Sequence, residues 1–214
     1  MEKDMLGTLV RKIADLPLET IRVLCDLVEK MLSETGHEWL IELKKFLRKE
    51  KCWVGTVLLK FLGKVVVFAT TEKFVARDKF VVNTGKNAPV KISYLGDEFR
   101  EWFLDKIEDL TDETVLHYAE LTKPSVDDSI IVELGNTAET TLSAVYALME
   151  SQSNRKDGAL LTNKYANLFY VRDVNGELRA VGVGWIGSGW GINASSVEHL
   201  DMRVRIDRVF FRNF

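Results

Sequence analysis

The chain has 214 residues, of which 46% are hydrophobic and 29% are charged, and its formal net charge is -3. This composition is typical of a folded globular protein and excludes collagen-like, low-complexity and disordered chains. A chain of this length can bury a core of normal size, so its stability does not require disulfides or structural metals.

Charged residues interrupt every apolar stretch before it reaches the roughly 18 residues that a membrane-spanning helix needs. The first five residues alternate in charge, whereas a secretory signal places cations before an apolar stretch. We therefore expect a cytoplasmic protein that does not span a membrane.

Residues 1–51 are predicted to form a helical N-terminal region. Apolar residues recur there at helical spacing in two runs, which are Ile21, Leu24, Val28 and Met31, then Trp39, Leu40, Leu43, Phe46 and Leu47. Pro17 suits the first turn of the first helix, and Gly36 is expected to end it. The two runs together predict a helical hairpin. Cys25 lies on the apolar stripe of the first helix, which predicts a buried, reduced thiol.

Residues 52–214 are predicted to form a mixed α+β body. From Trp53 the apolar period changes to two, which predicts strands around residues 54–68, 79–83 and 90–95, with a hairpin turn at 62–64. An amphipathic helix that Asp97 could cap follows, over residues 99–110. Capping boxes at Ser125 with Asp128 and at Asn136 with Glu139 predict two further helices, before and after Gly135.

The loop at 151–158 is a candidate boundary inside this body. Five apolar segments follow it, at residues 160–161, 167–172, 177–185, 190–197 and 204–211, and Asp173-Val174-Asn175-Gly176 between two of them is a hairpin-turn sequence. These segments predict a C-terminal β-meander. Because helices and strands are segregated along the chain, we expect an α+β fold: an N-terminal helical hairpin followed by a mostly antiparallel β body with inserted helices.

Several stretches resemble a group of uncharacterised bacterial proteins. The stretches lie at residues 91–99 (KISYLGDEF), 138–142, 160–167, 176–181 and 210–213 (FFRN). The resemblance implies a bacterial cytoplasmic protein. It brings no activity, cofactor or catalytic residue.

Charge is unevenly distributed along the chain. Basic residues outnumber acidic ones over residues 53–100, whereas acidic residues dominate residues 101–157. Two interpretations stay open: the two segments form ordinary solvated faces, or the acidic segment forms a docking surface for a basic partner.

The familiar motifs of cofactor and metal sites are incomplete. Residues 182–187 fit G-x-G-x-x-G, but no helix is expected after them to bind a pyrophosphate. The three histidines, His37, His117 and His199, are far apart, and no Cys-x-x-Cys pair is present. We therefore expect no cofactor and no metal.

Three functions remain as predictions. The first is a non-enzymatic binding protein whose partner is another protein, with Trp185 and Trp190 facing each other across a hairpin and Arg179 nearby as the binding residues. The second is a hydrolase that uses His199, Asp201 and a neighbouring serine, Ser195 or Ser196.

The third function is the binding of single-stranded nucleic acid by a basic and aromatic C-terminal strand. This strand holds Arg203, Arg205, Arg208, Phe210, Phe211 and Arg212. The negative net charge opposes this function, because phosphate binding needs a concentrated positive surface. The sequence leaves the oligomeric state open.

Overall fold

The computed structural model describes residues 3–14, 16–49, 57–198 and 202–212. The contacts divide the chain into two units, residues 1–56 and 57–214. The predicted boundaries at 51/52 and at 151–158 stay predictions. None of the helices in the described ranges is both long and apolar enough to cross a membrane.

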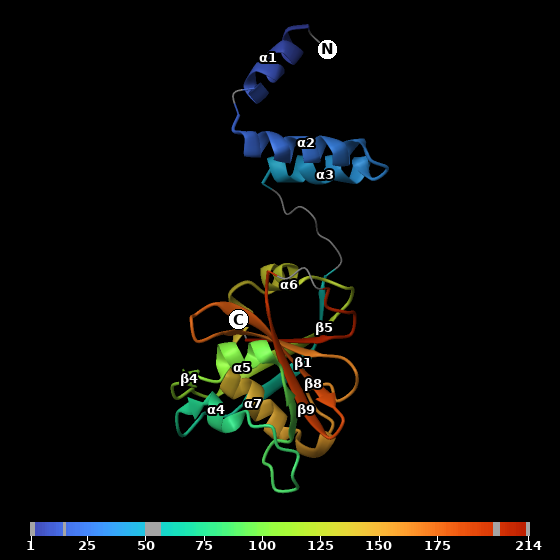
Figure 1. Ribbon diagram of the computed structural model, residues 1–214. Helices are drawn as coiled ribbons and strands as arrows, with labels where there is room; N and C mark the ends of the chain where they lie inside the picture. Colours follow the sequence, from blue (N-terminus) through green and yellow to red (C-terminus); the bar gives the residue numbers. More distant parts are fainter. Residues whose placement is uncertain (1–2, 15, 50–56, 199–201, 213–214) are drawn as a thin grey trace. The chain divides into compact units, whose positions relative to one another are not determined.

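The first unit is helical. Its helices are α1 (Lys3–Ala14), α2 (Leu18–Leu32) and α3 (Gly36–Leu47), and α2 packs against α3 (Figure 1). Gly36 does not end α2 as predicted. That helix ends at Leu32, and Gly36 begins α3, where an added Cβ would lie 2.0 Å from the carbonyl oxygen of Met31. A glycine is therefore required where the two helices meet.

The second unit is built on a mixed sheet (Figure 1). The strand order is β1-β5-β10-β7-β8-β9-β3, and β6 pairs with β7. The strands are β1 (Leu59–Val67), β3 (Ile92–Leu95), β5 (Thr114–Leu121), β6 (Glu139–Thr140), β7 (Asn167–Arg172), β8 (Leu178–Ile186), β9 (Gly189–Ser196) and β10 (Arg208–Arg212). Most neighbours are antiparallel, whereas β10–β7, β3–β9 and β6–β7 are parallel. The predicted α+β class with a mostly antiparallel sheet is confirmed.

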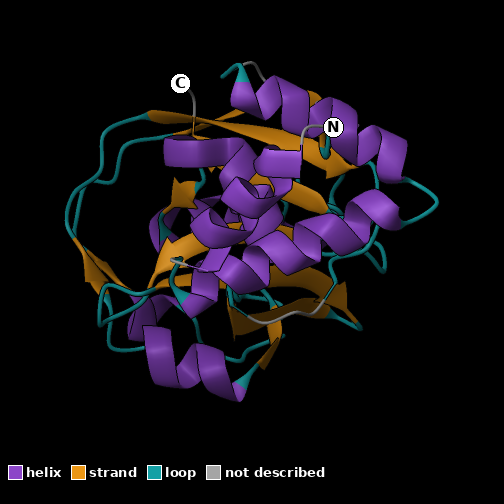
Figure 2. Ribbon diagram, turned by 90° about the horizontal axis from the view of Figure 1, so that it is seen from above, coloured by secondary structure: helices purple, strands orange, loops and turns teal. Residues whose placement is uncertain are grey.

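The remaining elements lie between these strands; Figure 2 distinguishes helices from strands by colour. They are β2 (Phe74–Val75), α4 (Ala76–Lys79), α5 (Asp97–Phe103), β4 (Ile107–Glu108), α6 (Asp127–Leu134), η1 (Gly135–Thr137), α7 (Leu142–Ser151) and η2 (Ser153–Arg155). β2 and β4 form a separate antiparallel pair.

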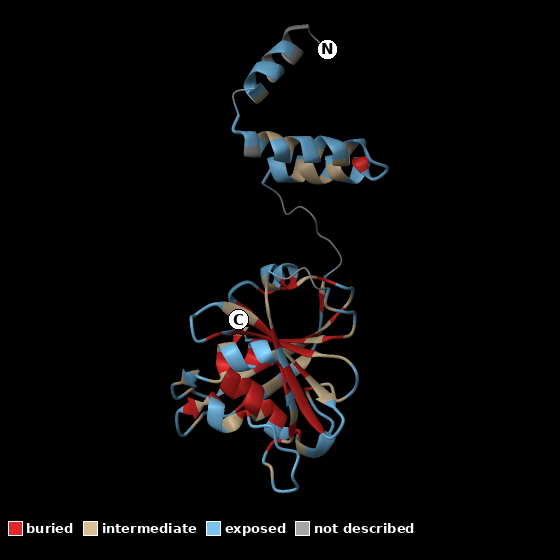
Figure 3. Cartoon of the chain, viewed as in Figure 1, coloured by how far each residue is buried: buried red, intermediate tan, exposed pale blue. Residues whose placement is uncertain are grey.

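Apolar residues are buried on both faces of the sheet. On the first face, α4, α5 and α7 cover a large core, and α7 is buried along most of its length (Figure 3). On the second face, α6 covers a smaller core. The central strand β7 shows why both are needed, because Phe169 and Val171 enter the first core, whereas Leu168 and Tyr170 enter the second.

Several local predictions are wrong. Residues 62–64 are not a turn: β1 continues through them with a bulge, where the ring of Tyr118 packs over Gly63. Residues 79–83 do not form a strand: α4 ends at Lys79, and no strand begins in the residues directly after it. Neither capping box forms. Val126 is the N-cap residue of α6, and Thr141 caps α7 by accepting a hydrogen bond from the backbone N–H of Ala144 at 3.2 Å.

Part of the C-terminal region is a succession of antiparallel neighbours. The chain passes from β7 to β8 through the turn predicted at Asp173–Gly176, and from β8 to β9 through Gly187, whose φ of 62° favours glycine. The next strand, β10, does not continue this order. It lies between β5 and β7, so β10 and β9 are not neighbours in the sheet.

Candidate functional site

The strand β1 forms an open edge of the sheet. It pairs with β5 on one side, and no other strand in the described ranges pairs with its outer side. An edge strand presents unpaired N–H and C=O groups that can bind another chain. The start of this edge is closed, because the carboxylate of Glu133 accepts hydrogen bonds from the N–H groups of Leu58 (3.0 Å) and Leu59 (3.1 Å).

A groove runs beside this edge on the first face, between β1 and α7; we call it the α7 groove. It consists of two hollows of about 480 and 310 Å³, and both are lined by Val67, Phe68 and Ala147. Hollows of this size are typical of sites for small molecules or side chains. Phe68 follows β1 directly and is 75% exposed, so a large apolar ring stands at the groove in contact with water.

The groove exists because one side of α7 carries small residues. Ser143, Ala147 and Ser151 recur every fourth position and all line the larger hollow. Residues four apart lie on the same side of a helix, so these small side chains leave room between α7 and β1. The opposite side of α7 is held firmly, since Leu142, Val145 and Met149 are completely buried.

The floor of the larger hollow is aromatic, and its rim is charged. The buried rings of Phe74 and Tyr146 lie 5.9 Å apart, and the ammonium group of Lys79 lies 5.9 Å from the ring of Tyr146. Burial raises the pKa of the Tyr146 hydroxyl, and the negative charge of Glu150 adds to the shift. The hydroxyl therefore stays protonated and can donate a hydrogen bond to an occupant of the groove.

A third hollow lies against the same strand on the second face. Its volume is about 420 Å³, and Phe61, His117 and Phe211 line it together with Leu59, Ala119, Glu133 and Leu134. The ring of His117 packs edge-on against Phe61 at 5.2 Å and against Phe211 at 5.7 Å. The edge strand β1 is therefore flanked by apolar hollows on both faces of the sheet.

Sequence reasoning missed this site. Its parts come from β1, the segment after it, β5, α7 and the end of β10, and no motif links them. One signal was available: residues 65–68 are four consecutive apolar residues, whereas a strand with one wet face alternates. Such a run indicates apolar surroundings on both faces of the strand.

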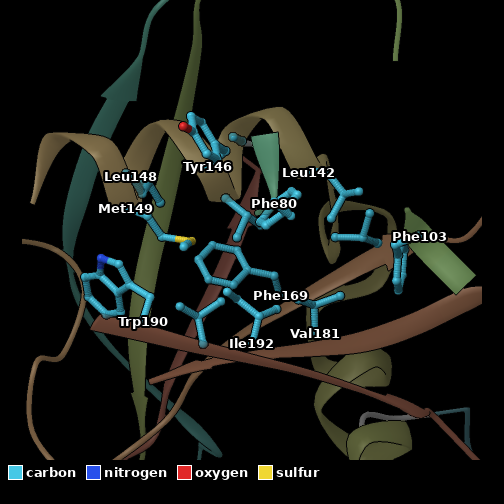
Figure 4. Packing of buried hydrophobic residues seen from close by; sticks show 14 of the residues in the cluster. Phe80, Phe103, Leu142, Tyr146, Leu148, Met149, Phe169, Val181, Trp190 and Ile192 are labelled. Carbon is cyan, nitrogen blue, oxygen red and sulfur yellow. The ribbon is translucent and has the colours of Figure 1, made fainter. Parts of the chain in front are cut away.

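The predicted binding residues Trp185 and Trp190 do face each other across the β8–β9 hairpin. Their rings meet edge-on with centroids 5.1 Å apart. Trp190 has an exposed fraction of 0% and lies beside Met149 and Leu148 in the first core (Figure 4). Trp185 is partly exposed, and its Nε1–H donates to the carbonyl of Gly187 at 3.1 Å. A partner at this hairpin would therefore meet Trp185.

Arg179, the third predicted binding residue, lies at the other end of β8. Its guanidinium stacks 4.3 Å from the ring of Trp102, and its Nε donates to Asp173 at 3.0 Å. Asp173 also accepts hydrogen bonds from the backbone N–H groups of Asn175 (2.8 Å) and Glu177 (3.0 Å). Arg179 thus joins α5 to the β7–β8 turn. Its binding role stays a prediction, as do those of the two tryptophans.

The Asp173 turn predicts an acid-sensitive contribution to stability. Burial opposes ionisation of Asp173, but the hydrogen bonds from Arg179, Glu177 and Asn175 outweigh it and lower the pKa. The ionised carboxylate therefore stabilises the fold above the unfolded-state pKa, and this contribution is lost as the pH falls through the lower folded-state pKa.

We expect Asp173→Asn to destabilise the protein at pH 7. The difference from the unchanged protein should shrink as the pH falls below about 4, the usual range of an aspartate. Urea unfolding at a series of pH values measures it, with Asp78→Asn on the exposed side of α4 as the control. A difference that is the same at every pH would contradict this role.

The predicted hydrolytic group lies only partly in the described structure. His199 and Asp201 fall outside the described residues. Ser195 is described, and its hydroxyl accepts a hydrogen bond from Nη2 of Arg203 at 2.8 Å. The hydrolase therefore stays a prediction.

The basic and aromatic strand places its rings inside the fold. Phe210 and Phe211 are buried, so neither offers a ring for base stacking. Arg208 donates to the carbonyl groups of Gly158 (3.2 Å) and Ala159 (2.6 Å), and Arg203 is bound to Asp127. Nucleic-acid binding likewise stays a prediction, without an exposed aromatic ring from these two positions.

The glycine-rich segment is a strand followed by a turn, as expected. Gly182 and Gly184 lie within β8, and the chain turns at Gly187 into β9 instead of a helix. A search of the described residues finds no group of three His, Cys, Asp or Glu side chains that could hold a metal ion.

Comparison of the chain with protein-family models, with curated proteins and with solved structures finds no match in any of the three.

Proposed function

We propose that this protein is a binding module that accepts an extended segment of another protein as an additional strand beside β1. The observation that carries the proposal is the open edge of β1 between apolar hollows on both faces of the sheet. In this mode of recognition, main-chain hydrogen bonds supply affinity, and alternate side chains supply specificity.

The two faces of β1 match the alternation of an added strand. Val65 and Val67 pair with Leu116 and Thr114 of β5 and line the α7 groove, whereas Phe61 lines the hollow on the second face. Successive side chains of a strand point to opposite faces. Every second side chain of the added segment would therefore enter the α7 groove, and the others would cover the hollow at Phe61.

Charge on the edge favours an acidic segment. β1 carries Lys60 and Lys64, both exposed, and contains no acidic residue. Opposite charges across neighbouring strands stabilise pairing, whereas like charges oppose it. We therefore expect the bound segment to have apolar residues at every second position and acidic residues beside Lys60 and Lys64.

Selection from a display library of short random peptides tests the proposal. The full chain should enrich peptides with apolar residues at every second position. Ala147→Trp fills the α7 groove and should weaken binding of an enriched peptide by about tenfold or more in calorimetric titration. Val132→Trp, at an exposed position of α6, is the matched control and should bind normally.

Backbone methylation of the peptide tests the edge itself without changing the protein. Methylation of every second amide nitrogen should abolish binding when the methylated N–H groups are those that bond to β1. Methylation of the other set, which points away from β1, should be tolerated. Equal effects of the two methylation patterns, or a peptide affinity unchanged by Ala147→Trp, would contradict strand addition.

The predictions on detailed architecture, location and partner are part of this proposal. The N-terminal helical hairpin remains a proposed part of the architecture, and the C-terminal meander is proposed only for β7, β8 and β9. A cytoplasmic location and a protein partner also remain proposals. The Trp185–Trp190 hairpin is a second, smaller contact surface in this proposal, supported by the partial exposure of Trp185.

A further inference from the structure

The helical unit leaves several of its apolar residues exposed. In its described part, the only buried residue is Gly36, so the unit is almost entirely pale blue and tan in Figure 3. Leu18 and Leu32 of α2 are 66% and 81% exposed, and Leu40 and Leu47 of α3 are also exposed. Two helices without a buried core are expected to need further helices for stability.

The exposed residues of α2 form a regular ridge. Leu18, Cys25 and Leu32 are spaced seven residues apart, and all three are exposed. Seven residues correspond to two turns, so the three side chains lie on one side of the helix, as in a coiled-coil seam. The prediction that Cys25 is buried is wrong for the single chain, although its position on an apolar stripe is correct.

The ridge is symmetric about Cys25. When two copies of α2 lie antiparallel, Leu18 of one copy meets Leu32 of the other, and the two Cys25 residues face each other at the two-fold axis. Such an interface is self-complementary, because each contact between two different residues occurs twice.

Opposite charges lie beside the ridge on either side of Cys25, one residue away from exact symmetry. Arg22 precedes Cys25 by three residues, and Glu29 follows it by four; both are exposed. In the antiparallel arrangement, Val28 of one copy lies opposite Arg22 of the other. Glu29 is the next residue along that helix, within reach of the Arg22 side chain, and this pair also occurs twice. Opposite charges beside an apolar seam are the usual determinants of partner and orientation in helix pairs.

We propose that the chain forms a homodimer through antiparallel packing of α2 against α2 of a second copy. Cys25 lies at the centre of this interface, and α3 of each copy covers its flank. The dimer would present two β1 edges, although its existence does not depend on what those edges bind.

Analytical ultracentrifugation of the full chain tests the proposal. The unchanged protein should sediment at twice 24.4 kDa at micromolar concentration. Leu32→Glu should raise the dimer dissociation constant by about a hundredfold or more, because it places a charge in the apolar seam. Val132→Glu, at an exposed position of α6, is the matched control and should remain dimeric.

A charge exchange distinguishes this dimer from other ways of covering the ridge. Arg22→Glu alone and Glu29→Arg alone should each weaken the dimer, and the double variant should restore it. A thiol-to-thiol cross-linker in a Cys52→Ser background should join two chains through Cys25, and Cys25→Ser should abolish the product. A monomeric unchanged protein, or a double variant weaker than both single variants, would overturn the proposal.

Discussion

Trp190→Ala should destabilise the second unit by about 3–5 kcal/mol, the usual range for removing a fully buried large aromatic side chain. The indole has no exposed surface and contacts Trp185 edge-on at 5.1 Å. In Figure 4 it fills the space between α7 and the sheet next to Met149. Truncation would leave a cavity lined by α7 and β9, two elements fixed by their other contacts. Urea unfolding followed by circular dichroism measures the loss.

Trp190→Phe is the informative comparison. The indole Nε1–H is buried, and no described residue accepts a hydrogen bond from it. A buried donor without a partner costs about 1–3 kcal/mol, and phenylalanine removes that cost while keeping most of the ring. We therefore expect a loss below about 1.5 kcal/mol, as for a conservative core replacement. A loss as large as that of Trp190→Ala would contradict this expectation.

The Trp190 result also bears on the predicted role of the hairpin in binding. A variant that unfolds cannot separate stability from partner recognition. Trp185→Ala is the better test, because Trp185 is only partly buried. Loss of partner binding with little change in stability would support the hairpin as a contact surface.

Local signals predicted the turns that join neighbouring strands. The Asp173–Gly176 turn forms because the Asp173 side chain accepts backbone N–H groups two and four residues later, and Gly176 adopts a φ of 84°. These interactions lie within one short segment. The Trp185–Trp190 pairing follows in the same way from the turn at Gly187. A single sequence contains all the information that such features need.

The α7 groove could not be predicted in this way. Its walls, β1 and α7, are separated by several elements along the chain, and a small-residue face on a helix has the same sequence pattern whether it packs tightly or lines a cavity. The capping predictions failed for a related reason. The N-terminal N–H groups of α7, at Leu142 and Ser143, bind the carboxylate of Glu108, which lies far upstream. Distant side chains can cap a helix without leaving a local motif.

The strongest long-range example is the buried ion pair of Asp127 and Arg203, separated by 76 positions. Arg203 donates to Asp127 through Nε at 2.9 Å and through Nη2 at 2.5 Å, and the side chain of Asp127 is completely buried. The hydroxyl of Tyr170 donates to the same carboxylate at 2.8 Å. Burial, reinforced by Asp127, raises the pKa of Tyr170, so this hydroxyl remains a donor.

We expect Asp127→Ala to cost about 3–5 kcal/mol, because it leaves the mostly buried guanidinium of Arg203 and the hydroxyl of Tyr170 without their acceptor. The double variant Asp127→Leu with Arg203→Met should cost less than the single variants Asp127→Leu and Arg203→Met added together, because it removes both charges. Urea unfolding of the complete double-mutant cycle measures the coupling.

The cycle also separates two roles for the Arg203 segment. If the ion pair only fixes the return of the chain from β9 to β10, the double variant should keep the peptide affinity of the unchanged protein, because the α7 groove lies on the opposite face of the sheet from α6. Additive costs in the cycle would show that Asp127 and Arg203 stabilise the fold independently. A double variant that folds but loses peptide binding would place the binding surface at α6 and contradict its assignment to β1.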